Sequence, residues 1–221
     1  MNDPIEKRLQ KNKEDGFIID SNDLRVEMCA GRVISWSNFR TKDLFFDMSN
    51  SEIGKSGLVS LNNGFIKGDL HVFGAGVDVR NFEVNNCEVD GKIVFDSVRI
   101  GNIKIVGKSS FLDFNKVDFG EIYGCGEFRK GIIMNRLKGN SVEINGYTDE
   151  VFLDELKLEK LKFLTFECNL IEGWNLQVTE ADLPFSQKVL LDNVSIEHLN
   201  MIEKSEVVGS IYNLKNANLN L

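Results

Sequence analysis

Five acidic residues are the side chains of this sequence whose positions best suit them to act on a partner. Each occupies the middle of an apolar–x–apolar triplet, as in Val77-Asp78-Val79. Because successive side chains of an extended chain point to opposite faces, an inward apolar pair directs the residue between its members outward. Outward carboxylates suit two chemistries: contact with a basic protein surface, or paired acid and base catalysis of glycoside hydrolysis. The five candidates are Asp78, Glu83, Glu88, Asp113 and Asp118.

Histidine and metal chemistry have little support in the sequence. Its two histidines, His71 and His198, each stand alone at a strand-like position beside apolar neighbours. A histidine in that setting is more often structural than catalytic. No HxH or HxxxH pair and no Cys/His cluster has the spacing of a metal site. We therefore predict no catalytic residue, no cofactor and no metal ion.

Two segments resemble a phosphate-binding loop without meeting its requirements. Residues 49–56 end in Gly-Lys-Ser, but Ser49 stands where the motif needs its first glycine. Residues 101–109 have both glycines with one residue too many between them. Neither segment leads into a helical pattern, which the motif needs because the phosphate sits on a helix amino terminus. The sequence therefore predicts no nucleotide site.

An apolar pattern with a period of five indicates the elements that position these residues. From about residue 77 to residue 201, apolar pairs in the pattern x-φ-x-φ-x recur at every fifth position, with slips of one or two residues. A helix has a period of 3.6 and a strand a period of 2, so neither alone produces this spacing. Short β segments that turn a corner every five residues do. The clearest pairs are Val77/Val79, Phe82/Val84, Cys87/Val89, Val151/Leu153, Leu156/Leu158, Leu161/Phe163 and Phe166/Cys168.

The fold class predicted by this period is all-β: an irregular, parallel β-solenoid. If each coil takes four five-residue segments, roughly twenty residues complete a turn, and about nine coils stack at the strand spacing of about 4.8 Å. Each coil buries its apolar pairs against the coils above and below it, so the fold grows in one dimension. The composition agrees, with 16 Phe, 19 Gly and only 2 Pro, since Phe favours strands and Gly tolerates tight corners.

The stretches VDVRNFEVNNCEVDG (77–91) and LDFNKVDFGEI (112–122) resemble pentapeptide-repeat proteins. That family forms a right-handed quadrilateral β-helix from five-residue units with an apolar central residue and a smaller one two places earlier. The resemblance implies a right-handed β-helix here. In this chain the earlier position is often Val, Ile, Phe or Leu, which implies an irregular or flattened cross-section.

Two functional expectations follow from resemblance alone. Some pentapeptide-repeat proteins are acidic rods that mimic duplex DNA and occupy the DNA-binding saddle of a topoisomerase, which implies an inhibitor or protector of a nucleic-acid-handling partner. A weaker similarity, to bactofilin-type polymerising β-helices, rests on GDLHV (68–72) and GKIVF (91–95). It implies a structural, self-assembling solenoid.

The chain divides into a short cap and one long domain. Residues 1–16 are predicted to form a helical cap that begins near Asp3 and ends at Gly16. Solenoids need such caps because an open end exposes unpaired strand edges. Residues 17–221 are predicted as a single β-solenoid domain, less regular over 17–73, regular over 77–201, and ending in a C-terminal coil or edge strand over 202–221.

Charge and composition describe an acidic protein of a reducing compartment. The chain has 34 acidic and 26 basic residues, a net charge of −8 at pH 7, which argues against direct contact with nucleic acid. No apolar run reaches the length of a membrane span, and the charged amino terminus lacks the apolar stretch of a signal peptide. The cysteines have no paired spacing, and Cys87 and Cys168 occupy inward positions. We therefore expect a cytoplasmic protein whose direct partners are neither nucleic acid nor membrane.

These observations predict a non-enzymatic solenoid that acts by protein–protein interaction through its outer face, with a protein partner of unknown identity. The alternative is a structural scaffold in which copies join as a homo-oligomer through the solenoid ends. A third is a carbohydrate-active β-helix enzyme, which needs two outward carboxylates in one cleft. Trp36 and Trp174 fall in less regular regions, where both core packing and a ligand patch stay open.

Overall fold

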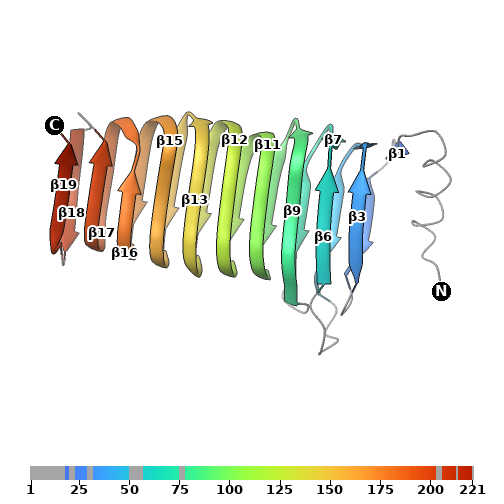
Figure 1. Ribbon diagram of the computed structural model, residues 1–221, viewed down its shortest axis with the longest axis horizontal. Helices are drawn as coiled ribbons and strands as arrows, with labels where there is room; N and C mark the ends of the chain where they lie inside the picture. Colours follow the sequence, from blue (N-terminus) through green and yellow to red (C-terminus); the bar gives the residue numbers. More distant parts are fainter. Residues whose placement is uncertain are drawn as a thin grey trace.

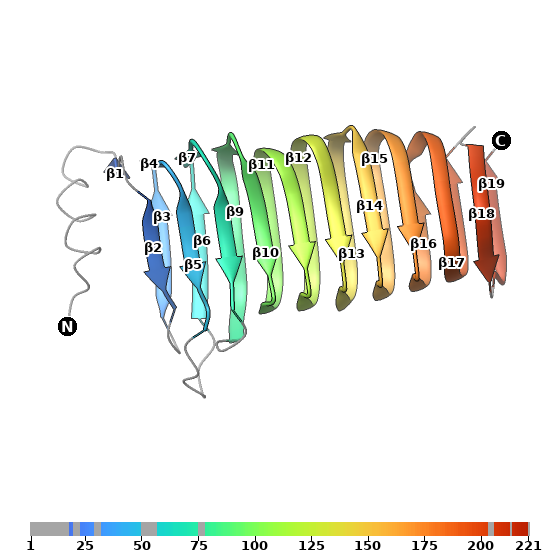
Figure 2. The same ribbon diagram turned by 180° about the vertical axis from the view of Figure 1, so that it is seen from behind.

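The chain is a parallel β-solenoid of about eight turns. In the residues that the computed structural model describes, all regular elements are strands. The coils follow one another along a single axis, from β1 to β19 (Figures 1 and 2). The predicted β-solenoid is confirmed, whereas the predicted helical cap at 1–16 lies outside the described residues. The described residues are 18–19, 23–28, 32–49, 57–74, 78–202, 206–212 and 214–220.

The strands pair in parallel from coil to coil and lengthen after the first third of the chain. The early ones are β1 (Ile18–Ile19), β2 (Leu24–Glu27), β3 (Val33–Ser37), β4 (Phe39–Thr41), β5 (Leu44–Asp47), β6 (Gly57–Asn62), β7 (Phe65–Ile66) and β8 (Leu70–Phe73). The later ones, several of which bend round a corner, are β9 (Asp78–Val89), β10 (Lys92–Asp96), β11 (Arg99–Asn115), β12 (Asp118–Asn135), β13 (Lys138–Thr148), β14 (Glu150–Asp154), β15 (Lys157–Trp174), β16 (Gln177–Leu183), β17 (Phe185–Ile202), β18 (Glu206–Tyr212) and β19 (Asn216–Asn220).

The length of a coil, taken from the register of stacked strands, changes along the chain. Leu44 pairs with Leu70, and Leu70 with Ile93, so these coils take 26 and 23 residues. Ile93 pairs with Leu112, and Leu112 with Ile132, so the next coils take 19 and 20 residues. The five-residue period is clear only where four segments fill a coil of about this length.

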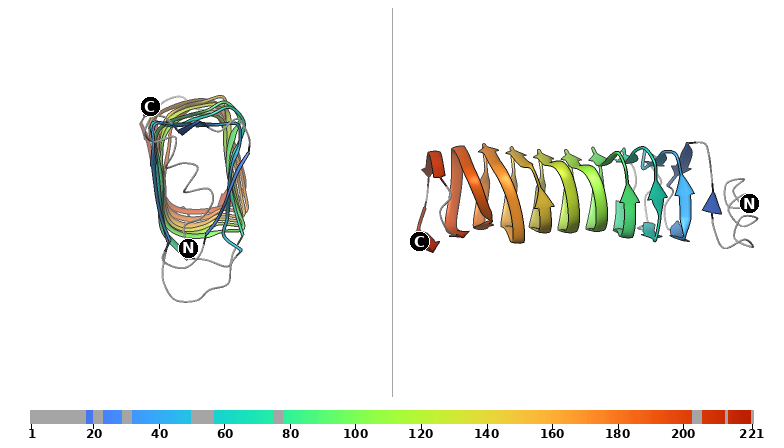
Figure 3. Two further views of the ribbon diagram at one scale, coloured as in Figure 1. Left: turned by 90° about the vertical axis from the view of Figure 1, so that its right-hand side faces the viewer. Right: turned by 90° about the horizontal axis from the view of Figure 1, so that it is seen from above.

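In cross-section the solenoid is a rectangle with two long and two short sides (Figure 3). We call the long side that faces the viewer in Figure 1 the β9 side; it stacks segments 81–85, 102–106, 121–125, 141–145 and 160–164. We call the opposite long side, which faces the viewer in Figure 2, the β10 side; it stacks segments 92–96, 111–115, 131–135, 150–154 and 170–174.

Inward side chains from all four sides form one continuous apolar core. Every described member of the predicted apolar pairs is buried, including Cys87 and Cys168. Phenylalanine rings connect the two long sides: Phe82 of the β9 side packs edge-on against Phe46 (5.2 Å between centroids) and Phe95 (5.3 Å) of the β10 side. This interior offers few partners for a hydroxyl group, which accounts for the preference for Phe over Tyr.

Left-handed residues turn the corner where each β10-side segment ends. At this corner Lys116, Arg136 and Glu155 have φ values of 53°, 56° and 51°, and Asn175 in the next coil has 54°. Positive φ is uncommon for residues other than Gly and Asn. Three of these four corners therefore carry no turn signal in the sequence.

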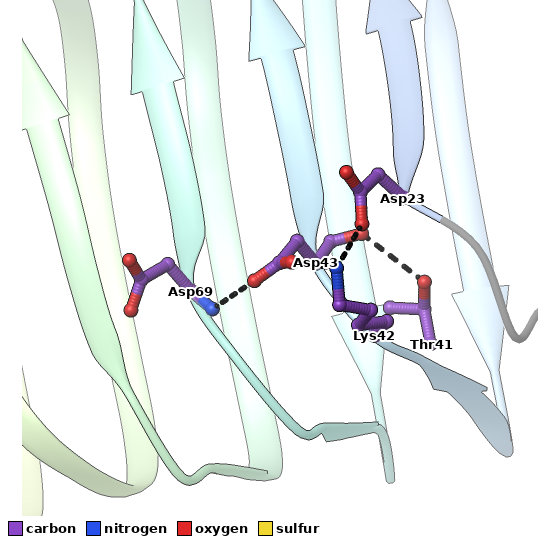
Figure 4. A network of polar contacts seen from close by, with 5 residues as sticks. All are labelled: Asp23, Thr41, Lys42, Asp43 and Asp69. Atoms are coloured by element: carbon purple, nitrogen blue, oxygen red, sulfur yellow. Dashed lines mark hydrogen bonds and ion pairs between the residues drawn. The ribbon is translucent and has the colours of Figure 1, made fainter.

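Aspartate side chains brace another corner in the N-terminal coils (Figure 4). A carboxylate oxygen of Asp43 accepts a hydrogen bond from the backbone N–H of Asp69 (2.7 Å), and Asp69 accepts one from Lys92 in the next coil (2.7 Å). A Cβ at Gly68 or Gly91 would collide with these carboxylates. The two glycines behind the weaker sequence similarity therefore make room for this corner.

Among the described residues, no helix is long and apolar enough to cross a membrane.

Candidate binding surfaces

The five acidic residues predicted to face a partner do not share one surface. Glu83 is central on the β9 side and Asp113 is central on the β10 side. Glu88 lies on one short side, 3.8 Å from Arg129. Asp118 lies on the other short side. Asp78, the first residue of β9, lies in register with Asp118 two coils earlier on the same side. The five-residue period itself produces this distribution, because each successive triplet follows a corner, so Asp78, Glu83 and Glu88 fall on three successive sides.

The central outward row of the β10 side is mainly apolar. In an ordinary solenoid this row meets solvent and is polar. Here six of its ten described members are apolar, and its one cation, Arg25, stands at the N-terminal end, 5.1 Å from the centroid of the Phe45 ring. All are half-buried except Arg25, which is exposed, and Val208, which is 47% exposed. The row comprises Arg25, Phe45, His71, Val94, Asp113, Ile133, Phe152, Glu172, Leu190 and Val208, stacked in successive coils.

Large apolar side chains also flank this row. Phe111 and Leu170 are half-buried two positions before the central row, and Lys92 lies over the Phe111 ring, 5.2 Å from its centroid. Phe73 and Trp174 occupy the row two positions after the central row, and Trp174 is 38% exposed. The apolar surface of the β10 side is therefore one row that runs through most of the coils, widened at these four positions, whereas Lys92, Glu150 and Lys188 occupy the same flanking row as Phe111 and Leu170.

The row two positions after the centre, which holds Phe73 and Trp174, also carries an acidic edge where the strands end. Asp96, Asp154 and Asp192 recur in this row, with Asn115 and Asn135 between the first two and Trp174 between the last two. Asn115 donates a hydrogen bond to Asp96 (2.8 Å), and Asn175 donates one to Asp154 (3.2 Å). Within the described residues, these three aspartates make no ion pair with Lys or Arg. The edge therefore retains uncompensated negative charge.

Besides Arg25 at its end, three polar residues, His71, Asp113 and Glu172, interrupt the apolar row. Burial in this setting raises the pKa of Asp113, and nearby Lys92 opposes the rise only in part. The His71 ring lies between those of Phe45 (6.3 Å between centroids) and Phe73 (5.3 Å). Its Nε2 is buried and has no hydrogen-bond partner among the described residues. The aromatic contacts agree with the structural role predicted for this histidine.

The β9 side has the opposite character. Its central outward row is Ser60, Glu83, Lys104, Tyr123, Glu143, Lys162, Asp182 and Asn200, which contains no aliphatic residue. Lys162 Nζ bonds Glu180 (2.7 Å) and Asp182 (3.2 Å), and these contacts raise its pKa, the hydrogen bond to Glu180 most. This side has the paired charges of a solvated β surface.

A groove of about 1140 Å³ runs along one short side, parallel to the solenoid axis. It follows seven stacked three-residue segments, from 78–80 in β9 to 195–197 in β17. The middle residue of each segment forms the floor, and outward side chains on both sides form the walls. The lining includes four cationic residues, Arg80, Arg99, Lys138 and Lys157, and three acidic ones, Asp118, Glu159 and Glu197.

The groove does not present a carboxylate pair suited to glycoside hydrolysis. Glu159 and Glu197 lie two coils apart, about 10 Å by strand spacing, near the upper limit for such a pair. Lys215 bonds Glu197 (2.6 Å) and lowers its pKa. A general acid needs the opposite, a raised pKa. The enzymatic alternative stays a prediction without a geometric argument in its favour.

Two cysteines, Cys87 and Cys168, and Trp36 belong to the core or pack against it. Burial raises the pKa of Cys168 to about 11 and also raises that of Cys87, so neither thiol is a ready nucleophile. Trp36 is half-buried and packs edge-on against Phe39 (6.1 Å between centroids). Across the described part of the chain, no three His, Cys, Asp or Glu side chains are grouped to hold a metal ion.

The phosphate-loop imitation at 101–109 lies inside β11, and the one at 49–56 falls almost wholly outside the described residues. A β-strand offers no helix amino terminus to a phosphate.

No protein-family model, no curated protein and no solved structure matches this chain.

Proposed function

We propose that this protein is a non-enzymatic, right-handed β-solenoid of the cytoplasm that acts by binding a protein partner along its β10 side. The observation that carries the proposal is the apolar central row, which recurs through coil after coil on the outside of the fold. The inward pairs already bury the core, so the fold itself does not require apolar residues there. Extended apolar surface on a soluble protein is typical of an interaction site.

The chemistry of the surface specifies the kind of partner. The apolar row suits aliphatic and aromatic side chains, and the uncompensated edge of Asp96, Asp154 and Asp192 suits a line of Lys or Arg beside them. A basic, amphipathic protein segment meets both conditions, since complementary charge fixes orientation while apolar contact supplies affinity. A nucleic-acid-handling protein is one source of such a segment; that identity stays a prediction.

A pair of photocrosslinking sites tests the proposal in cells. A photoreactive phenylalanine analogue is placed at Phe152 on the β10 side and, as a matched control, at Glu143 on the β9 side. We expect a protein adduct from position 152 that is absent from position 143 and that diminishes at high salt. In the Phe152 variant, Ile133→Lys should reduce the adduct by about tenfold, because it places a buried like charge against a basic partner. Tyr123→Lys on the β9 side should leave it unchanged.

Equal adducts from both positions would contradict the proposal, as would a partner without a basic segment. An adduct with the mass of two copies of this chain would instead support self-association.

Self-assembly through the solenoid ends is a second candidate, favoured by the C-terminal coil. Val208, Tyr212 and Leu214 are 47%, 56% and 42% exposed there. Exposed apolar residues on a terminal coil suit contact with another molecule. Light scattering at increasing protein concentration tests this candidate. Growing assemblies that Tyr212→Glu abolishes support it, and a monomer of constant mass contradicts it.

A further inference from the structure

The groove on the short side is shaped for a long ligand. It crosses seven coils, which at about 4.8 Å per coil gives a length of about 29 Å. Its volume of about 1140 Å³ exceeds what a small molecule usually occupies. Because the wall residues recur once per coil, the groove offers the same kind of contact at regular intervals. A linear polymer that lies parallel to the solenoid axis matches this form.

The charge of the groove points to an anionic ligand. Lys138 and Lys157 are direct register partners in adjacent coils, so two exposed cations stand at about the strand spacing. Like charges at such positions destabilise a sheet, although Lys138 also has the acidic Asp118 as its register partner in the preceding coil. Neither lysine makes an ion pair with any described carboxylate, and the same holds for Arg80. Of the three acidic lining residues, Glu197 is already paired with Lys215.

More positive charge stands on the rim. Lys116 and Arg136 occupy the corner positions two residues before Asp118 and Lys138, and both are exposed. Arg136 is paired with Glu155 (3.0 Å). A protein with a net charge of −8 therefore gathers a local excess of cations along this one groove.

We propose that this groove binds a linear anionic polysaccharide whose sugar units carry carboxylates. The unpaired lysines suit carboxylate groups that recur along a chain. Between the charges the lining holds Asn140, Gln177, Thr179 and Ser195. These side chains can donate to and accept from sugar hydroxyls.

Two other linear anions fit less well. Single-stranded nucleic acid relies on aromatic side chains that stack its bases, but the one aromatic ring of the lining, Phe119, is 9% exposed. An acidic peptide could bind by adding a strand only at an open sheet edge. The side of a solenoid offers none, because the backbone groups of each coil bond to the coils above and below.

The site is independent of the proposed protein-binding surface. The groove lies on a short side, whereas the β10 side faces another direction, so a variant in one leaves the other intact. Polymer binding therefore tests the groove, and the photocrosslink from position 152 tests the protein-binding surface, so that one proposal can fail while the other holds. Groove variants should not change the photocrosslink from position 152.

Titration of the full chain with polygalacturonate at low salt tests the proposal, with dextran, polyglutamate and oligo-dT as comparison polymers. We expect binding of polygalacturonate that weakens as salt is added, and no binding of dextran. The double variant Lys138→Gln/Lys157→Gln should weaken binding by about tenfold, the effect of losing two exposed ionic contacts. The matched double variant Lys104→Gln/Lys130→Gln removes the same charge outside the groove and should weaken it less than about twofold.

The conservative variant Lys138→Arg/Lys157→Arg should retain binding, and thermal unfolding of each variant checks that the fold is intact. Equal losses in both glutamine variants would overturn the proposal, because they would show a general charge effect. Tighter binding of oligo-dT or polyglutamate would overturn the polysaccharide assignment. No polymer binding up to about millimolar would overturn the site itself.

Discussion

The two long sides of the solenoid share one core and one five-residue pattern, yet their outer surfaces have opposite chemistry. Across the β9 side the central row alternates charges, as with Glu143 and Lys162. Across the β10 side the same structural positions hold Ile133 and Phe152. Stacking and core packing constrain only the inward residues, so the fold tolerates either surface. The solenoid therefore does not require the apolar row, and this is the basis of the proposed interaction.

The largest loss of stability is expected at the inward phenylalanines, because both long sides contribute them to the same core. Phe82→Ala on the β9 side and Phe114→Ala on the β10 side each remove a side chain that is 0% exposed. Each should lower the free energy of unfolding by about 3–5 kcal/mol, since a cavity remains in a close-packed core. Chemical denaturation measures both. A much smaller loss on one side would show that the sides do not share a single core.

The next largest loss of stability is expected at the corner where the β9-side segments end. Gly146 has a φ of 126°, and a Cβ there would collide with the carbonyl oxygen of Gly126. We expect Gly146→Ala to destabilise the protein by about 1–3 kcal/mol. Gly131→Ala is the control, because Gly131 has no positive φ and its Cβ would meet the Phe111 ring at 3.1 Å and the Glu150 carbonyl oxygen only at 3.5 Å. Comparable losses at both glycines would mean that crowding, and not backbone conformation, decides the effect.

Substitutions of outward residues should change the surface properties of the β10 side but not those of the β9 side, with little change in stability on either side. Ile133→Lys/Phe152→Lys should change the free energy of unfolding by less than about 1 kcal/mol. It should also reduce the fluorescence of an apolar-surface dye by about half or more, because it interrupts the apolar row. Tyr123→Lys on the β9 side should leave the dye signal unchanged. Equal dye binding by all variants would refute the contrast between the sides.

The ion network of the β9 side should contribute a smaller stabilisation. Contacts with Glu180 and Asp182 raise the pKa of Lys162 above its usual 10.5. The stabilisation is therefore present at neutral pH and lost as the pH rises through that raised pKa. Lys162→Met should cost less than about 1 kcal/mol at low salt, and still less at high salt, because the pair is partly exposed. Denaturation at two salt concentrations checks this, and a salt-independent loss would point to packing.

Substitution of Asp113 on the β10 side should change the free energy of unfolding least, and it should increase stability where the other substitutions decrease it. Burial raises its pKa above the usual 3.8, so folding favours the protonated carboxyl group. Its stabilisation is present below pH 3.8 and lost as the pH rises through the raised pKa. Asp113→Asn should therefore be slightly more stable than the wild type at neutral pH, and the difference should vanish on acidification. Denaturation midpoints across this pH range measure it, and a destabilised variant at neutral pH would contradict the assignment.

The sequence identified which residues face inward but not which outward residues stand together. Val79, Phe114, Cys168 and their equivalents are buried as predicted, because alternation along a strand is local and each apolar pair records it. Sharing a side is a property of the whole coil. It depends on coil lengths of 26, 23, 19 and 20 residues and on corners such as Lys116 that carry no turn signal. The five-residue spacing already disperses the acidic residues over successive sides, whereas the apolar row and the lysine pair of the groove came together only when the coils closed.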